Sequence, residues 1–262
     1  MSKKLQFSKY QGAGNDFILI DNRNGNFDAS NQDLIKKICD RRFGVGGDGL
    51  MLLQNSIKYD FEMVYFNADG GEGTMCGNGG RCIVAFARDL NIINENTDFV
   101  AVDGPHKAEI FEHQVNLGMI DVNSINRDGE AFVLNTGSPH YVQKVDNLGA
   151  YDVYKEGYAI RNNDSYGKQG INVNFIEQEG EGYFVRTFER GVEDETYACG
   201  TGATAAAMAM AIDKGIEGDI TIPVRVLGGQ LYISFHKNGN NFSNVYLKGP
   251  ANFVFKGEIE IA

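Results

Sequence analysis

Apolar and polar residues alternate along much of the chain, which is the pattern of β-strands with one buried face. In the stretch YDFEMVYF (59–66), apolar side chains alternate with carboxylates over the first five positions. Strands are expected there and at Phe17–Asp21, Leu50–Gln54, Phe99–Val102, Asn172–Glu177, Tyr183–Phe188, Ile220–Val226, Gln230–Phe235 and Phe253–Ile261. The pattern therefore predicts a sheet-rich protein with few long helices.

Three helices are expected between these strands. The first extends from about Asn31 to Arg42. Ser30 is its expected N-cap, and Asp33, three residues later, completes a capping-box arrangement. The others run over about Gly77–Leu90 and Gly200–Asp213. Both contain long apolar runs, CIVAFA and ATAAAMAMAI, and a helix without a polar face is normally enclosed on every side.

The two apolar helices begin alike, with CGNG from Cys76 and CGTG from Cys199, 123 residues apart. An independent pair, GNDF from Gly14 and GSPH from Gly137, has the same separation. Two unrelated motifs at one offset indicate a duplicated unit of roughly 120 residues, a longer period than solenoid repeats show. The alternative is a chance coincidence of glycine-centred tetrapeptides. We expect two lobes, residues 1–120 and 121–251, with the boundary in a polar stretch.

Charge and hydropathy exclude several classes of protein. The 24 basic and 35 acidic residues give a net charge of −11, which disfavours binding to nucleic acid or to an anionic membrane. The longest apolar run, Ala203–Ile212, is half of the roughly 20 residues that a bilayer span needs. We expect a cytoplasmic protein.

Four cysteines in a chain of this length are too sparse for a disulfide framework, and none has the C-x-x-C spacing of a zinc site. Cys76 and Cys199 each precede a Gly-x-Gly helix start, where the positive end of the helix lowers a thiol pKa and binds anions. A lone cysteine of this kind is more often a small buried apolar residue, and this is our interpretation of Cys39 and Cys82.

Two such cysteines in equivalent places of a duplicated unit favour a chemical role instead. If the halves face each other, two thiols flank one ligand while two helix starts hold its carboxylate. One thiolate then removes the Cα proton of an amino acid, and the other thiol returns a proton to the opposite face. That reaction inverts a stereocentre without a cofactor.

The run GVGGDG at 44–49 has the G-x-G-x-x-G spacing of a dinucleotide site. A helix is expected before it and a strand after it, the reverse of the strand–turn–helix order that directs N–H groups at a pyrophosphate. No nucleotide cofactor is therefore expected.

At these motifs the sequence resembles the diaminopimelate epimerase family over nearly its whole length. The matching pieces are YQGAGNDFILID, CDRRFGVGGDG, FNADGGEGTMCGNGGRC, GSPH, NVNF, FERGVEDETYACGTGA and GPANFVFKGEIEI. The resemblance implies an α+β fold of two pseudo-symmetric lobes, each a mostly antiparallel sheet wrapped round a central helix, with the active site in the cleft between the lobes. It also implies that the last strand, residues 252–262, returns to the first lobe.

Members of this family convert LL-2,6-diaminopimelate to the meso isomer without pyridoxal phosphate or metal, for lysine and peptidoglycan synthesis. The resemblance implies the same substrate and no cofactor here, and we expect a homodimer. By position, Cys76 and Cys199 correspond to the acid/base pair, supported by His140 and Glu189. The expected substrate-binding residues are Asn15, Asn67, Gly77, Asn78, Asn172, Glu189, Arg190, Gly200 and Thr201.

Three positions depart from the common family pattern. Gly49 stands where many members carry a substrate-contacting Gln, and Ser138 where many carry Asn in a Gly-Asn-Pro-His motif. We count both as candidate substrate contacts. The GVEDET loop is one residue longer than usual, so Glu189 lies ten residues before Cys199, whereas Asn67 lies nine before Cys76.

Three other functions are alternatives to diaminopimelate epimerisation. Proline racemases and hydroxyproline epimerases share the two-thiol logic, but a ring substrate leaves Asn67, Asn172 and Arg190 unpaired, at roughly 1–3 kcal/mol each. Phenazine-type isomerases of the same fold do not keep the cysteine pair. A non-catalytic amino-acid-binding protein has no use for two matched thiols.

Overall fold

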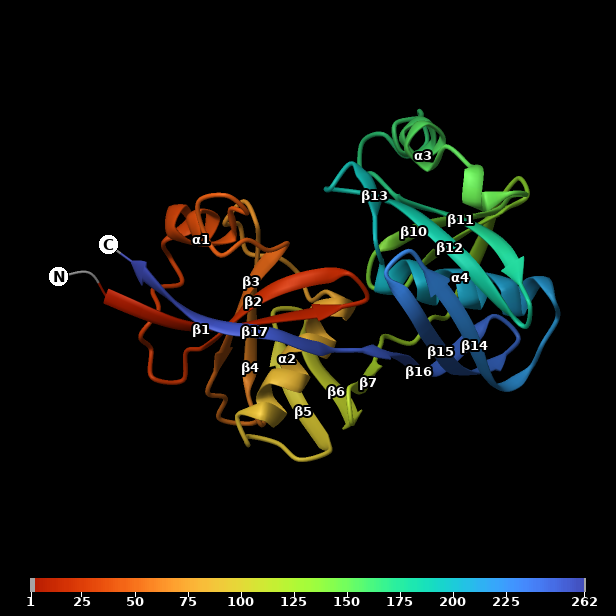
Figure 1. The fold of residues 1–262 in the computed structure, drawn as a ribbon. Coiled ribbons are helices and arrows are strands. Elements are labelled where there is room, and N and C mark those ends of the chain that lie inside the picture. The colour runs from red at the N-terminus through yellow and green to blue at the C-terminus, as the bar shows by residue number, and fades with distance from the viewer. Residues whose placement is uncertain (1–2, 262) are drawn as a thin grey trace. The chain divides into compact units, whose positions relative to one another are not determined.

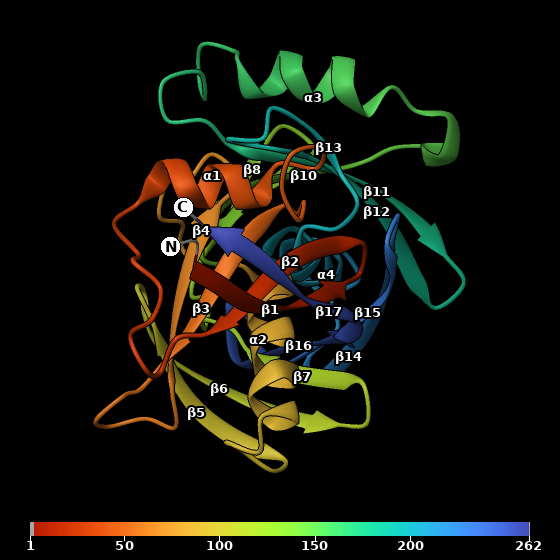
Figure 2. The same ribbon diagram turned by 60° about the vertical axis from the view of Figure 1, so that its left-hand side comes forward.

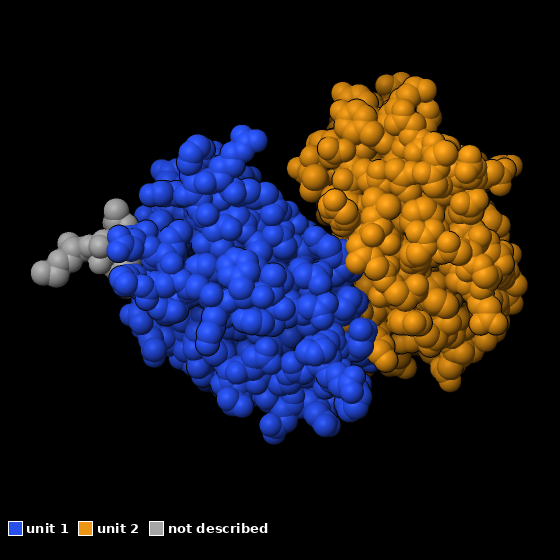
Figure 3. All heavy atoms as spheres, in the orientation of Figure 1, with its two compact units in different colours: residues 1–117, 250–262 blue, residues 118–249 orange. Residues whose placement is uncertain are grey.

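A computed structural model describes residues 3–261 of the chain. They form two compact units, residues 3–117 with 250–261 (unit 1) and residues 118–249 (unit 2), coloured separately in Figure 3. The limits expected from the sequence, 120 and 252, lie a few residues away. Each unit has the α+β architecture expected, a mostly antiparallel sheet with one central helix (Figure 1).

The sheet of unit 1 has the strand order β17-β1-β2-β3-β4-β5-β6-β7. Only the β2–β3 and β4–β5 pairs are parallel among these. The strands are β1 (Lys3–Gly12), β2 (Asn15–Asp21), β3 (Gly49–Gln54), β4 (Glu62–Asn67), β5 (Asn96–Ala101), β6 (Gly104–Phe111), β7 (Gln114–Gly118) and β17 (Asn252–Ile261). The two ends of the described chain pair with each other, Lys3 opposite Ile261.

The sheet of unit 2 repeats this order with β8-β9-β10-β11-β12-β14-β15-β16, and β13 pairs with β12. Its parallel pairs are β10–β11 and β12–β14. The strands are β8 (Ile125–Asp128), β9 (Ala131–Asn135), β10 (Pro139–Lys144), β11 (Asn172–Glu179), β12 (Gly182–Glu189), β13 (Asp194–Thr196), β14 (Gly218–Val226), β15 (Gly229–Asn238) and β16 (Asn241–Pro250).

The strand register shows that the duplication extends beyond the glycine motifs. In the parallel pair β2–β3, Phe17 lies opposite Gly49, and in the parallel pair β10–β11, His140 lies opposite Asn172. Both members of the second pair stand 123 residues after their counterparts in the first. The two units therefore repeat at the level of individual residues, which a chance match of glycine motifs does not explain.

In each unit, one α-helix connects the two strands of the first parallel pair. In unit 1 this is α1 (Gln32–Cys39), and in unit 2 it is α3 (Val153–Arg161), preceded by the 3₁₀ turn η1 (Leu148–Ala150). Each packs on the strands of its own unit, and Figure 2 shows α3 at the top of the view, above β10 to β13. Ile35 and Ile38 anchor α1 in the first apolar core, and Val153 anchors α3 in the second.

The central helices are α2 (Gly77–Asp89) and α4 (Gly200–Asp213). In α2 every residue from Gly77 to Ala87 is buried, against β1, β2, β3, β6 and β17. In α4 burial runs from Gly202 to Ala211, against strands β9 to β12, β14 and β15. The prediction of two enclosed helices is confirmed.

Other expectations need correction. The N-cap of α1 is Asn31, whose side chain accepts from the N–H of Leu34 at 3.0 Å, while the Ser30 hydroxyl donates to Asp28. The helix also ends at Cys39, because Asp40 has extended backbone angles, and not at Arg42. The alternation does not reveal β1, β7, β8, β9, β10, β13, β16 or helix α3.

Candidate active site

Cys76 occupies the N-cap position of α2, with extended backbone angles (φ −104°, ψ 130°), and is partly exposed. No side-chain capping bond is formed at this helix start within the described structure. The next residues, Gly77 and Asn78, are buried. A Cβ at Gly79 would lie 2.6 Å from the Met51 side chain, so a glycine lets the first turn pack against β3. The first N–H groups of any helix have no partner within the helix itself, so a helix start can bind an anion.

Cys199 occupies the equivalent position of α4, again extended (φ −110°, ψ 109°) and without a side-chain capping bond in the described structure. It is buried, and its Sγ lies 3.5 Å from the Thr201 hydroxyl. A Cβ at Gly202 would lie 2.3 Å from the Asn174 side-chain oxygen, so only glycine fits. Each unit therefore presents one thiol at a glycine-rich helix start.

A polar chain supports the start of α2. Asn78 donates to the Asn15 side-chain oxygen at 3.0 Å, and Asn15 donates to Asp48 at 2.5 Å. Asp48 and Asp16 both accept from Arg41 at 2.6 Å. Two of the predicted substrate-binding residues, Asn15 and Asn78, thus lie together beside Cys76.

A second cluster forms at one end of β10–β12 in unit 2. The Asn172 amide donates to the Ser138 hydroxyl at 2.9 Å and to the Pro139 carbonyl at 3.1 Å, and its oxygen accepts from the Arg190 N–H at 2.9 Å. The Arg190 guanidinium also donates to Ser138 at 3.3 Å and to the Gln169 carbonyl at 3.2 Å. The structure thus brings together Ser138, Asn172 and Arg190, three of the residues expected to contact the substrate.

His140 is fully buried beside the start of α4. Burial and the nearby Arg190 charge lower the pKa of its imidazole to about 3, so it is neutral at physiological pH. The Asn174 amide donates to its Nδ1 at 3.1 Å, which places the ring proton on Nε2. Among the described residues Nε2 has no hydrogen-bond partner. Any part that His140 plays in proton transfer is that of a neutral imidazole.

The remaining predicted residues lie at strand ends. Glu189, the last residue of β12, accepts from the Thr196 hydroxyl at 2.9 Å. Asn67 ends β4 in a tight turn, with its N–H bonded to the Gly71 carbonyl at 2.9 Å, and it pairs with Gly49 across the sheet. A Cβ at Gly49 would lie 2.5 Å from the ring of Tyr65, which therefore fills the space of a larger residue 49.

Cys39 and Cys82 fit the packing role expected for them. Both are buried, at 3% and 0% exposure. Burial raises the pKa of each thiol to about 12, so neither is a thiolate at neutral pH. The first is the last residue of α1 and the second lies inside α2.

Neither a metal cluster nor a nucleotide loop is found in the part of the chain that the structure describes. No group of three or more His, Cys, Asp or Glu residues could hold a metal ion there. The GVGGDG run lies between α1 and β3, the order expected to exclude a dinucleotide. No described helix is long and apolar enough to cross a membrane.

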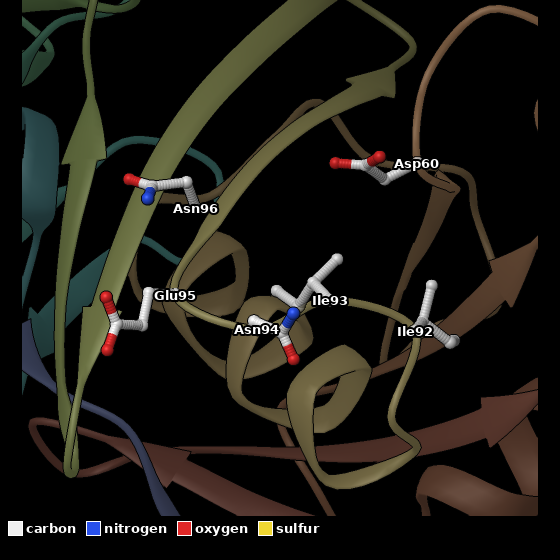
Figure 4. Close-up of a pocket in the computed structure, with 6 residues that line it drawn as sticks. All are labelled: Asp60, Ile92, Ile93, Asn94, Glu95 and Asn96. Atoms are coloured by element: carbon white, nitrogen blue, oxygen red, sulfur yellow. The ribbon is translucent and has the colours of Figure 1, made fainter.

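One surface hollow of about 690 Å³ is lined by Asp60, Ile92, Ile93, Asn94, Glu95 and Asn96 (Figure 4). It contains none of the predicted site residues. The Asp60 carboxylate is engaged by the Thr97 hydroxyl at 2.9 Å and the Asp98 N–H at 3.0 Å. The Asp60 carboxylate of this hollow is therefore already engaged by residues of β5.

Sequence reasoning missed four residues that the structure places at the site: Arg81, Thr204, Asn174 and Tyr65. A charged residue inside an otherwise apolar helix was the available signal for Arg81. Asn174 follows Asn172 by two residues, a spacing that puts both on one face of β11. Thr204 carries no such signal, because it is one uncharged residue within the apolar run ATAAAMAMAI.

Comparison with solved structures defines the class of fold. A PhzF-family phenazine biosynthesis protein from Bacillus anthracis matches with a TM-score of 0.79 at 15% identity, covering 99% of this chain and 100% of that one. A hydroxyproline epimerase from Agrobacterium vitis matches with a TM-score of 0.72 at 12% identity, covering 98% and 93%. At such low identities the likeness establishes the fold alone.

Sequence comparison narrows this to one family. The diaminopimelate epimerase family profile matches residues 7–124 and 132–254. The chain is 54% identical to the diaminopimelate epimerase of Flavobacterium psychrophilum over 97% of its length and all of that protein's, and 43% identical to that of Chlorobaculum tepidum over 95% and 99%. The chain belongs to the diaminopimelate epimerase family.

Proposed function

We propose that Cys76 and Cys199 are the acid/base pair with which this isomerase converts LL-diaminopimelate to meso-diaminopimelate in lysine biosynthesis. Support comes chiefly from one observation: each unit has a cysteine at the N-cap of its enclosed helix, at the same residue offset. A helix start lowers the pKa of an adjacent thiol and binds a carboxylate through its N–H groups.

The proposed reaction moves one proton off Cα and another onto it. The thiolate of one cysteine takes the Cα proton and becomes a thiol, leaving the electron pair on the carbon. The thiol of the other cysteine then donates its proton from the opposite face and becomes a thiolate. Both thiols must therefore act on the same Cα, one from each side. The carbanion is stabilised next to a carboxylate held by N–H groups of Gly77, Asn78, Gly200 and Thr201.

We propose that the polar clusters of the two units bind the rest of the substrate. The Ser138, Asn172 and Arg190 cluster offers a guanidinium that can hold a carboxylate through two parallel hydrogen bonds. Asn15 and Asn67 offer amide groups from unit 1. His140 and Glu189 are assigned supporting roles beside Cys199, His140 as a neutral imidazole.

The direct test follows Cα hydrogen exchange in deuterated water with the reduced protein. We expect exchange and inversion with LL-diaminopimelate, and none with L-proline or trans-4-hydroxy-L-proline. Dialysis against a chelator should leave the activity unchanged. Turnover of a ring substrate at a comparable rate would overturn the substrate assignment, and recovery of a chelator-sensitive activity with metal would overturn a cofactor-free mechanism.

We further propose a homodimer in the cytoplasm. Phe253, Val254 and Phe255 of β17 are 49%, 51% and 44% exposed, and an apolar strand at the edge of a sheet favours self-association. Reduced thiols, which the reaction needs, persist in the cytoplasm. Light scattering should show a dimer that Val254→Lys dissociates, whereas Val102→Lys, at an exposed valine in the turn after β5, should leave it intact. A monomeric parent protein would contradict the proposal.

A further inference from the structure

A buried cation lies at the start of α2. Arg81 is fully buried, one helical turn after Gly77. Its guanidinium donates to the Gly77 carbonyl at 3.1 Å, to the Asn78 side-chain oxygen at 2.9 Å and to the Pro250 carbonyl at 3.3 Å. All three acceptors are neutral, and no carboxylate of the described residues forms an ion pair with it. Arginine remains protonated even when burial lowers its pKa, as it does here.

The equivalent residue in unit 2 is Thr204, 123 positions later and also fully buried. Its hydroxyl donates to the Gly200 carbonyl at 2.9 Å, as Arg81 does to the Gly77 carbonyl at the equivalent place in α2. One helix start is therefore stabilised by a cation and the other by a neutral hydroxyl. The two starts differ by one buried positive charge.

The other charged groups around α2 cancel. Asp16 and Asp48 carry two negative charges, and Arg41 and Lys9, which pair with them, carry two positive ones. Hydrogen bonds link this group to α2 through the Asn15 and Asn78 amides. The Cys82 thiol, also on α2, is neutral because burial raises its pKa to about 12. Arg81 remains as the net charge at this helix start, and it interacts electrostatically with Cys76.

Around the start of α4, the described residues add no buried cation. His140 is neutral, and Asn174 and Thr187 are uncharged. Arg190 and Glu189 bring opposite charges from neighbouring positions, and the Arg190 side chain is engaged by Ser138 and Gln169. The start of α4 thus has the helix dipole without a buried guanidinium beside it.

We propose that Arg81 is a positioning residue that makes Cys76 the more acidic of the two thiols, so that the resting enzyme holds a Cys76 thiolate and a Cys199 thiol. This inference rests on the proposed two-cysteine function. Cys76 is then the base that starts a turnover. The turnover leaves the proton on Cys76 and the negative charge on Cys199, so a proton returns from one to the other through solvent before the next cycle.

Single-thiol proteins test this without any substrate. Cys39→Ala/Cys82→Ala/Cys199→Ala retains Cys76 alone, and Cys39→Ala/Cys82→Ala/Cys76→Ala retains Cys199 alone. The pH dependence of alkylation by iodoacetamide gives the titration midpoint of each thiol. We expect the Cys76 midpoint to lie at least one pH unit below that of Cys199.

Substitution of Arg81 then identifies the cause. In the Cys76-only protein, Arg81→Met should raise the midpoint by at least one unit, and Arg81→Lys, which keeps the charge, should change it by less than half a unit. In the Cys199-only protein, Arg81→Met should leave the midpoint unchanged. If circular dichroism shows that Arg81→Met does not fold, Arg81→Gln, which retains an amide donor, replaces it.

Equal midpoints for the two thiols, or a lower one for Cys199, would overturn the inference. So would a folded neutral variant at position 81 that leaves Cys76 titrating as before. A protein that titrates as expected but fails to exchange the Cα hydrogen of diaminopimelate would instead overturn the proposed function, so the two failures are distinguishable.

Discussion

Unit 1 and unit 2 share a backbone plan but not the side chains that use it. At equivalent positions the first has Asn15, Phe17, Gly49, Asn67 and Arg81, and the second has Ser138, His140, Asn172, Arg190 and Thr204. Only the cysteine, its following glycine and the glycine two positions later are the same at the helix starts. What duplication preserved is the presentation of a thiol at a helix start, and what diverged is the charge and the hydrogen bonding around it.

The divergence assigns different work to the two units. In unit 1 a buried guanidinium stands behind the helix start, and Gly49 leaves its space to the Tyr65 ring. In unit 2 the corresponding strand position carries Asn172, which makes three hydrogen bonds within a cluster that includes Arg190. If the two units carried the same side chains at these positions, they would interact with a ligand in the same way. Because the side chains differ, we expect the two units to have different roles.

The largest effect should come from removing either thiol. Cys76→Ala and Cys199→Ala should each lower the rate of inversion by a factor of about 10³ or more, because each face of the Cα needs its own proton donor or acceptor. The measurement is the interconversion of LL- and meso-diaminopimelate. Cys39→Ala and Cys82→Ala are the controls and should retain most of the activity. An active Cys199→Ala enzyme would end the two-base interpretation.

The second effect concerns His140 and its counterpart Phe17. The folded-state pKa of His140, about 3, lies below the unfolded value near 6.5, so the unfolded chain binds the extra proton between these values. Stability is therefore full above pH 6.5 and falls as the pH drops towards 3, by about 2 kcal/mol between pH 7 and pH 5.

Urea unfolding at the two pH values measures this loss. His140→Phe, which gives unit 2 the residue of unit 1, should remove most of the pH dependence in that range. His236→Gln, at a surface histidine, is the control and should keep it. A His140→Phe protein with the same acid sensitivity as the parent would show that another group is responsible.

The third effect concerns Arg190, whose equivalent in unit 1 is Asn67, a residue without a positive charge. Arg190→Lys keeps the charge but loses the planar pair of donors, so kcat/KM for diaminopimelate should fall by about tenfold or more, the equivalent of about 1.4 kcal/mol. The Tm should hold, since the hydrogen bonds of this side chain within residues 3–261 are two long ones, at 3.2 and 3.3 Å. Arg127→Lys, elsewhere in unit 2, should change neither value. Unchanged kinetics for Arg190→Lys would mean a surface role only.

The smallest effect should come from the connecting helices. The side chains of Asn31 and Asp152 cap α1 and α3 by accepting from Leu34 and Lys155. Asn31→Ala and Asp152→Ala should each cost about 1 kcal/mol in urea unfolding, with little change in activity. Ser30→Ala should cost less, because Ser30 is not the cap. A larger loss for Ser30→Ala than for Asn31→Ala would contradict the capping assignment.

The sequence predicted the parts of the fold that carry a strong local signal. The enclosed helices could be located from their long apolar runs and glycine-rich starts, and the α+β class from the alternation. Helix α3 could not, because Gly157 interrupts it. A Cβ there would lie 2.4 Å from the Cβ of Phe188, so tertiary packing requires the glycine that lowers the helix propensity.

At the site, the motif residues were predictable and their partners were not. The family resemblance supplied Asn15, Asn172 and Arg190, and the structure adds what holds them: Asp48 for Asn15 and Ser138 for the other two. The neutral state of His140 depends on its complete burial, which no local pattern reveals. Likewise, Arg81 acquires its meaning only when Thr204 is seen to make the same contact from a neutral group.

The cysteine at each helix N-cap also sets a limit on how stable this protein can be. Serine and aspartate are the residues that cap helices well, and neither Cys76 nor Cys199 makes a capping bond in the described structure. Cys76→Ser or Cys199→Ser would therefore raise the melting temperature while removing the reactive sulfur. The natural chain forgoes that gain at both helices, which is the trade-off expected where the proposed chemistry needs a thiol at each helix start.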